Sequence, residues 1–237
     1  MAGETIKTEA ICLDVRPWSR TSHVVSWLTP TGKVATVVKG AVRAKSQFLG
    51  QYDLNYTCDI VYYARAKGEL HALRECVPVE MREALRSDYR KLALAGYMRR
   101  LVAELAPMGE ECRAWYEFLR RDLEDIRPKT EDLIQFELEV LRLSGLAPDF
   151  SKFEKNSEWS AFSVETGTFG VTEGRCIRIS REVAEYLASG AKNAKKLQTP
   201  LDAARVIGVF YQFHLDCASD VRRTVLGMIS SSKEGNG

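Results

Sequence analysis

Residues 22–40 read SHVVSWLTPTGKVATVVKG, two runs of β-branched and aromatic residues on either side of a Thr-Pro-Thr-Gly break. Runs of this kind favour β-strands, and the proline and glycine between them indicate a turn. Working outward, we expect further strands in TEAICLDVRP before this stretch and in LNYTCDIVYYAR and ELHALRECV after it. Five strands between residues 5 and 78, with no helical pattern between them, predict a small closed antiparallel barrel.

After Pro78 the apolar residues repeat with the period of an α-helix. Helices are predicted at residues 94–105, 111–126, 131–144 and 200–229. Residues 160–179 alternate instead and contain three glycines, which indicates one or two β-hairpins. We therefore expect an α+β, multidomain protein. A five-stranded OB-fold barrel would occupy residues 1–79, and a helical bundle with the hairpin insertion would occupy 80–237, ending in a disordered tail near 230–237.

The composition is that of a folded protein, because 45% of the 237 residues are hydrophobic and 28% are charged. No apolar run is long enough for a membrane helix, and the polar start lacks the apolar core of a signal peptide. A cytoplasmic protein without membrane contact is expected. The six cysteines are widely separated and include no C-x-x-C pair, so we expect them to be reduced.

Charge is distributed unevenly, and the unevenness falls on the predicted barrel. No aspartate or glutamate occurs between Asp14 and Asp53, and we call residues 15–52 the acid-free window. Its six cations are Arg16, Arg20, Lys33, Lys39, Arg43 and Lys45. Because the whole chain has a net charge of only +2, a local excess of this kind suggests contact with a polyanion such as nucleic acid. The alternative is an ordinary solvated surface.

Aromatic residues in the same window strengthen the nucleic-acid interpretation. Single strands bind in basic grooves that also offer rings on which bases can stack, and Trp18 and Phe48 are the candidate rings. Trp27 alternates with Val25 and is expected in the barrel core. Lys33 and Lys39 are six residues apart, which on one strand face corresponds to about 20 Å.

Signals of catalysis are missing from the sequence. It contains no Walker loop, no G-x-S-x-G elbow and no H-E-x-x-H motif, and its three histidines fall in different predicted elements. Glu137 and Glu139 are two residues apart on a helix, so they point to different faces and make a poor acid/base pair. An enzyme is therefore the weaker hypothesis. A nuclease would need metal-binding carboxylates near the acid-free window, which has none.

Two stretches resemble a known family. LDVRPWSRTSHVVSWLTPTGKVATVVKGAVRAKSQFLG, residues 13–50, and FELEVLRLSGLAPDF, residues 136–150, resemble the RecO family of bacterial recombination mediators. The resemblance implies a non-enzymatic, nucleoid-associated protein. It implies binding to single- and double-stranded DNA, strand annealing, association with RecR and single-stranded-DNA-binding protein, and indirect help in loading RecA. The matching basic positions Arg16, Lys39, Arg43 and Lys45 become the first candidates for DNA contacts, with Arg20 and Lys33 next.

The sequence departs from the family pattern in its basic turn and in its zinc-binding region. Residues 42–49 are less basic than in many members, which would mean fewer phosphate contacts and a shallower salt dependence. Many members bind zinc with cysteine pairs. Here Phe153 and Asn156 occupy the stretch where the first pair is expected, and Cys176 stands alone. Zinc needs four ligands, so we predict no cofactor and hairpins that hold by packing.

The third departure concerns the acidic tail of single-stranded-DNA-binding protein. Many members have a basic residue just before the Phe-Glu pair, where this chain has Gln135. Arg120 and Arg121 are an alternative docking site for the tail, because an acidic tail needs cations beside an apolar pocket. The other open hypothesis for the whole protein is an adaptor that bridges partner proteins. An adaptor would tolerate neutralisation of the basic residues.

Overall fold

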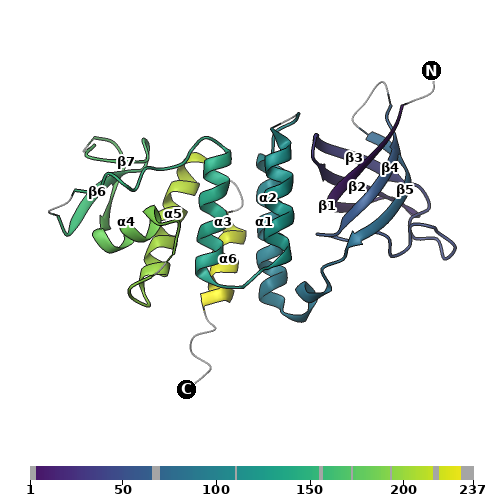
Figure 1. The fold of residues 1–237 in the computed structure, drawn as a ribbon. Coiled ribbons are helices and arrows are strands. Elements are labelled where there is room, and N and C mark those ends of the chain that lie inside the picture. Colours follow the sequence, from purple (N-terminus) through teal and green to yellow (C-terminus); the bar gives the residue numbers. More distant parts are fainter. Residues whose placement is uncertain are drawn as a thin grey trace. The chain divides into compact units, whose positions relative to one another are not determined.

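The computed structural model describes residues 4–65, 70–109, 111–154, 157–171, 173–192, 194–215 and 219–230. Its first part is a closed barrel with the strand order β1-β2-β3-β5-β4 (Figure 1). The strands are β1 (Thr5–Ser19), β2 (Ser22–Thr29), β3 (Gly32–Val38), β4 (Thr57–Tyr63) and β5 (Leu70–Glu80). The predicted five-stranded barrel is confirmed.

One strand pair differs from the antiparallel expectation. β3 and β5 run parallel, with Ala35 opposite Leu70 and Val37 opposite Ala72, whereas the other four pairs are antiparallel. The reason is parity. Strands that alternate in direction around a closed ring must be even in number, so a ring of five contains one parallel pair.

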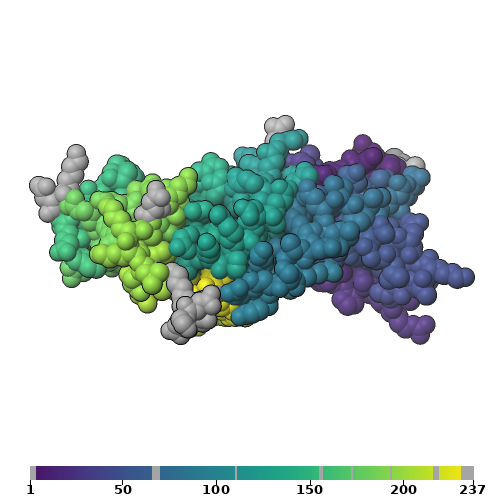
Figure 2. Space-filling view, turned by 60° about the horizontal axis from the view of Figure 1, so that its bottom comes forward, coloured from purple at the N-terminus to yellow at the C-terminus, as the bar shows by residue number. Residues whose placement is uncertain are grey.

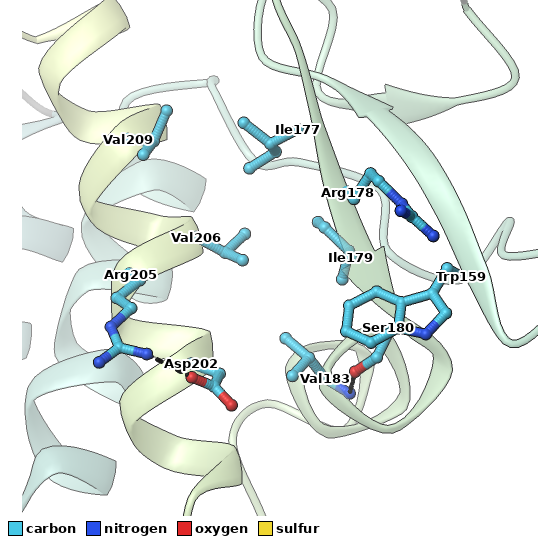
Figure 3. Close-up of a pocket in the computed structure, with 10 residues that line it drawn as sticks. All are labelled: Trp159, Ile177, Arg178, Ile179, Ser180, Val183, Asp202, Arg205, Val206 and Val209. Atoms are coloured by element: carbon cyan, nitrogen blue, oxygen red, sulfur yellow. Dashed lines mark hydrogen bonds and ion pairs between the residues drawn. The ribbon is translucent and has the colours of Figure 1, made fainter.

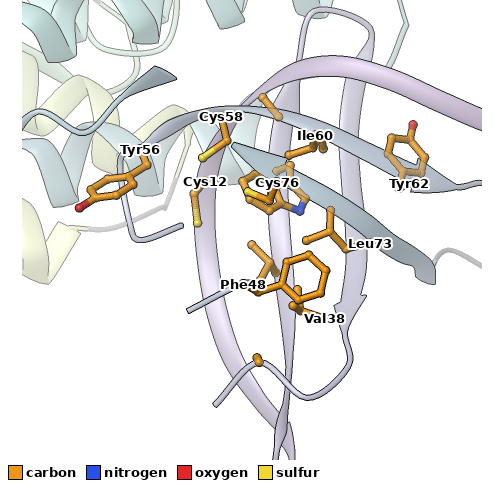
Figure 4. Packing of buried hydrophobic residues seen from close by; sticks show 13 residues of the cluster. Cys12, Val38, Phe48, Tyr56, Cys58, Ile60, Tyr62, Leu73 and Cys76 are labelled. Carbon is orange, nitrogen blue, oxygen red and sulfur yellow. The ribbon is translucent and has the colours of Figure 1, made fainter. Parts of the chain in front are cut away.

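The barrel interior is apolar and holds the aromatic residue that the alternation predicted there. Trp27 is fully buried, and its indole Nε1 donates to Thr36 Oγ1 at 2.9 Å. Cys12, Cys58 and Cys76 belong to the same core cluster (Figure 4). These thiols, together with buried Cys112 and half-buried Cys176, are free. Cys217 lies outside the described residues.

Two helices belong to the same compact unit as the barrel, which spans residues 1–125. They are α1 (Tyr89–Leu105) and α2 (Cys112–Glu124), preceded by the short helix η1 (Glu83–Ser87). The blue surface of the barrel continues into the teal surface of these helices (Figure 2). The domain boundary that we predict at residues 79/80 remains a prediction.

The second compact unit spans residues 126–237 and combines helices with a small sheet. Its helices are α3 (Thr130–Leu143), α4 (Arg181–Ala188), α5 (Thr199–His214) and α6 (Ser219–Ser230). Its strands are β6 (Trp159–Ser163), β7 (Thr168–Phe169) and β8 (Cys176–Ser180), in the order β7-β6-β8. The helical part and its β insertion are confirmed. The helix predicted at 200–229 occurs as two helices, and the residues between them include the undescribed 216–218.

The β insertion is held by aromatic packing. Phe162 is fully buried, and its ring centroid lies 5.0 Å from that of Phe150 and 5.1 Å from that of Phe169. Phe153 makes an edge contact with Phe169 at 5.2 Å. Packing of this kind is what the sequence predicts for these hairpins. Within the part of the chain that the structure describes, no helix is both long and apolar enough to span a membrane.

Candidate nucleic-acid interface

Strand register brings both halves of the acid-free window to one end of the barrel. Ser19 pairs with Ser22 at the tip of the β1–β2 hairpin, and His23 pairs with Val38 at the end of β3. Two hydrogen bonds then hold the following loop against that tip: Gly40 N–H donates to Ser22 Oγ, and Val42 N–H donates to Thr21 O. We call the exposed cations and the tryptophan of this hairpin and of the loop that follows β3 the basic end; they are Arg16, Trp18, Arg20, Lys39, Arg43 and Lys45.

The loop at residues 39–51 is a series of turns anchored at several points. Gly40 has a φ of 67°, a backbone conformation that favours glycine, and Arg43 N–H donates to its carbonyl at 3.1 Å. Ala41 and Phe48 are buried in the barrel core. Gln47 Nε2 donates to Arg74 O on β5 at 2.9 Å. These contacts fix the loop to the barrel and leave Lys39, Arg43 and Lys45 exposed on it.

Trp18 owes its position to a β-bulge. Pro17 pairs with His23 and Ser19 pairs with Ser22, so β1 has one residue more than β2 between these pairs. That residue is Trp18, which is 62% exposed. Bulges often re-aim a side chain next to a functional site. Here the bulge leaves a large aromatic ring in solvent beside the cations of the basic end.

The cations of the basic end differ in whether a carboxylate lies near them. Among the residues that the structure describes, no carboxylate lies within ion-pair distance of Arg20, Lys39, Arg43 or Lys45. Arg16 differs, because its Nε contacts the Asp14 carboxylate while the side chain remains 76% exposed. Unpaired cations on a common surface concentrate positive potential, which attracts an anionic polymer.

The other two predicted DNA contacts lie elsewhere. Lys33 is near the opposite end of β3, and its Nζ donates to the Ala103 carbonyl of α1 at 3.0 Å. Phe48 is only 8% exposed, and Figure 4 shows its ring inside the barrel beside Val38 and Leu73. Its ring therefore has no open face at the surface. The sequence predicts Phe48 as a stacking ring, but its burial makes it an anchor for the loop instead.

Register also creates a cation and ring pair that lies outside the acid-free window. Tyr63, at the end of β4, is 42% exposed, and the Arg74 guanidinium lies 5.7 Å from its ring centroid. Gln47 contacts the Arg74 carbonyl, so this pair adjoins the anchored loop. Sequence reasoning missed it because a contact between residues eleven positions apart in separate strands depends on register.

Arg120, one of the two predicted partner contacts, is occupied within its own unit. Its Nη1 donates to Glu9 at 2.8 Å and its Nη2 donates to Glu80 at 2.6 Å, which ties α2 to strands β1 and β5. The hydrogen bond to Glu80 raises the pKa of the Arg120 guanidinium. Tyr116 also donates to Glu9, and burial is the main cause that raises the pKa of its hydroxyl. Arg120 therefore has little freedom to meet an acidic tail.

Arg121, the other predicted partner contact, faces solvent. Its guanidinium lies 5.5 Å from the Phe118 ring centroid and pairs with Asp122 at 2.8 Å. Trp115 and Phe118 are each 3% exposed, so both rings belong to the core of this unit. Arg121 is therefore an exposed cation beside buried rings, and its role in binding an acidic tail stays a prediction.

The residues of the β insertion do not fit a structural zinc ion. The Phe153 ring packs on Phe169, and the Cys176 thiol donates to Val171 O at 3.3 Å. Asn156 lies outside the described residues. Across the described ranges, no three side chains of histidine, cysteine, aspartate or glutamate gather as metal ligands would. The absence of a bound cofactor stays a prediction.

Fold and surface together define the class: an OB-fold protein whose barrel has one basic, tryptophan-bearing end and is continued by a helical part with a β insertion. Models described as Recombination protein O N terminal and Recombination protein O C terminal match residues 1–82 and 86–217. The chain belongs to the RecO family, as the two resembling stretches predict.

Curated relatives agree with this membership. Proteins named DNA repair protein RecO from Alkaliphilus metalliredigens and Moorella thermoacetica are 31% and 28% identical to this chain over 150 and 145 residues. Each alignment covers 60% of this chain, and the two cover 59% and 54% of the relatives. The chain thus matches little more than half the length of these curated relatives.

Proposed function

We propose that this protein is a DNA repair and recombination mediator that binds single- and double-stranded DNA through the basic end of its barrel. The observation that carries the proposal is that the β1–β2 hairpin tip and the loop bonded to it carry an exposed tryptophan and four cations for which the described residues offer no carboxylate partner. Cations bind phosphates of any sequence, so binding is largely sequence-independent. The Trp18 ring adds a stacking surface for unpaired bases.

Annealing follows from the same surface. Two strands held on a cationic surface repel each other less, and base pairing then supplies the free energy. The activity involves no covalent step and no nucleotide. In keeping with its family, the protein works with RecR and single-stranded-DNA-binding protein to help load RecA onto coated strands.

The test is a titration of fluorescein-labelled single-stranded DNA at several salt concentrations. The test variant is Lys39→Ala/Arg43→Ala/Lys45→Ala. The matched control is Lys7→Ala/Lys129→Ala/Lys192→Ala, which removes the same charge from exposed positions outside the basic end. We expect the test variant to bind more weakly, with a log–log salt slope shallower by about 0.7 per lost contact, roughly two units in all. The control should keep the wild-type slope.

Two outcomes would argue against this function. If both variants keep wild-type affinity and slope, the basic end is not the DNA surface, and the alternative of a protein-interaction adaptor becomes the better one. If both lose affinity equally, binding depends on total charge and not on this end of the barrel. A separate assay follows annealing of complementary oligonucleotides in EDTA without ATP, where we expect wild-type protein to accelerate pairing.

A further inference from the structure

We propose that the free edge of β8, with the apolar pocket beside it, binds an extended peptide segment of another protein by strand addition. The inference uses no residue of the barrel and goes beyond the proposed DNA function. Its parts are an open strand edge, a pocket that bends around that edge, and Arg178, a cation for which the described residues offer no carboxylate partner. All three lie within the second compact unit.

The edge is identified by the pairing of β8. In the sheet order β7-β6-β8 this strand has a neighbour on one side only. Val164 N–H donates to Arg175 O and Arg181 N–H donates to Glu158 O, so the odd-numbered residues of β8 exchange hydrogen bonds with β6. The backbone groups of Cys176 and Arg178 therefore point away from β6. Within the described ranges no other segment bonds to them.

The pocket has a volume of about 330 Å³ and lies between β8 and α5. Figure 3 shows Ile177 and Ile179 on β8 pointing toward Val206 and Val209 on α5. Arg178 and Trp159, from the opposite face of the sheet, also line it. Because successive residues of a strand point to opposite faces, a pocket lined by Ile177, Arg178 and Ile179 must wrap around the edge of the strand.

The positive charge of Arg178 at the pocket favours a partner that carries a carboxylate. Arg205 is paired with Asp202 at 2.7 Å, which leaves Arg178 as the cation without a carboxylate partner among the lining residues. The Arg178 guanidinium lies 5.5 Å from the ring centroid of Trp159, which is 48% exposed. The pocket therefore suits one aliphatic or aromatic side chain with a carboxylate nearby.

An extended peptide satisfies all of these features together. Its backbone pairs with the free N–H and C=O groups of β8, one apolar side chain enters the pocket, and an acidic side chain meets Arg178. A helix would leave the strand edge unpaired. A nucleic acid would find an aliphatic floor and, among the described residues that line the pocket, one cation without a carboxylate partner, which is little for a phosphate backbone.

The test uses a fluorescein-labelled seven-residue peptide with valine and glutamate alternating around a central phenylalanine. A twin peptide carries N-methyl groups on alternate residues, which abolishes strand pairing and keeps every side chain. We expect the anisotropy of the first peptide to saturate with full-length protein at a dissociation constant on the order of 100 μM, and the twin not to bind. Arg178→Glu and the pocket-filling Val209→Phe should each weaken binding by about tenfold.

The matched control is Arg175→Glu, which makes the same charge change just before β8 but does not line the pocket. It should bind like the wild type. Thermal unfolding checks that each variant is folded. If Arg178→Glu does not fold, the binding measured with Val209→Phe tests the proposal. The proposal is overturned if wild-type protein shows no binding up to about 1 mM, or if the N-methylated twin binds equally. A concentration-dependent dimer that Arg178→Glu abolishes would instead assign the edge to a second copy of this chain.

Discussion

The ion pair between Glu137 on α3 and Arg222 on α6 is buried among helices. Glu137 is 0% exposed, and the guanidinium donates to both of its carboxylate oxygens, at 2.7 and 2.8 Å. Arg222 also donates to Ala204 O on α5, so it joins three helices. Gly208 provides the room, because a Cβ there would lie 2.5 Å from Arg222 Nη1.

Removing one partner should therefore destabilise the second unit. We expect Arg222→Met to lower the free energy of unfolding by about 3–5 kcal/mol, because it leaves the Glu137 carboxylate buried without its cation. The double variant Glu137→Leu/Arg222→Met should recover most of this loss. Urea unfolding of the wild type, Arg222→Met, Glu137→Leu and the double variant measures both effects. If Arg222→Met is as stable as the wild type, the pair contributes little.

Asp88 caps the N-terminus of α1, and its charge should make stability depend on pH. Its carboxylate accepts from Arg90 N–H at 2.9 Å and pairs with the Arg90 guanidinium at 2.7 Å. The side-chain hydrogen bond from Arg90 is the main cause that lowers the pKa of Asp88 to about 2. A lowered pKa contributes stability above the unfolded value of about 4, which is lost as the pH falls toward 2.

The substitution that isolates this charge is Asp88→Asn, because asparagine can still cap the helix. We expect it to lower the melting temperature at pH 6, with the difference from wild type shrinking between about pH 4 and pH 2. Melting curves at several pH values measure this. A difference that stays constant down to pH 2 would mean that the charge of Asp88 is not the cause.

At the scale of elements, the bulge in β1 gives Trp18 a role that differs from that of the cations. Stacking on a ring does not release counterions, so its loss should not change the salt slope. We expect Trp18→Ala to weaken binding to single-stranded DNA by about tenfold with an unchanged slope, measured by the same anisotropy titration. An effect as large on blunt duplex as on single strands would argue against stacking.

Removing the buried anchor of the loop at residues 39–51 should reduce the stability of the barrel. Phe48 packs in the barrel core, so Phe48→Ala should cost about 3–5 kcal/mol of stability. Chemical denaturation measures this loss. Leu49→Ala is the control, because Leu49 is the next residue and is 59% exposed. It should change stability by less than about 0.5 kcal/mol.

How far the sequence predicts these elements depends on periodicity. The five strands follow from alternation, and Glu137 and Glu139 do lie in different environments, one buried and one half-exposed. The loop that holds Phe48 has no period, so its residue type alone could not separate a core anchor from a surface ring. Helix α4 is too short to show a helical repeat, although Ser180 caps its first turn. The helical periodicity around Arg120 predicts that this residue lies on the solvent-exposed face of its helix. Its two carboxylate partners come from distant strands, so they become visible only in the folded structure.

On the scale of the whole molecule, the barrel and the first two helices form one compact unit. Arg99 donates to Leu13 O and Lys33 donates to Ala103 O, in addition to the bonds of Arg120. A fragment of residues 1–125 should therefore melt at a higher temperature than a fragment of residues 1–82. We expect a difference of at least about 10 °C, since each kcal/mol is worth about 4–8 °C in a domain of this size. Circular dichroism of both fragments provides the measurement, and equal melting temperatures would show that the helices do not stabilise the barrel.

The bonds of Arg120 also have a consequence for synthesis on the ribosome. Glu9 and Arg120 are 111 positions apart in the chain. At about 5–20 residues per second, translation needs on the order of ten seconds to deliver the cation after the carboxylate has been made. During that interval strands β2 to β5 are made, but until α2 has been made the barrel lacks the ion pairs of Arg120 and the full helical part of its compact unit. Apolar residues that those helices cover in the folded unit are then open to other chains. The rate at which the ribosome translates α1 and α2 therefore determines how long the newly synthesised barrel strands remain prone to aggregation.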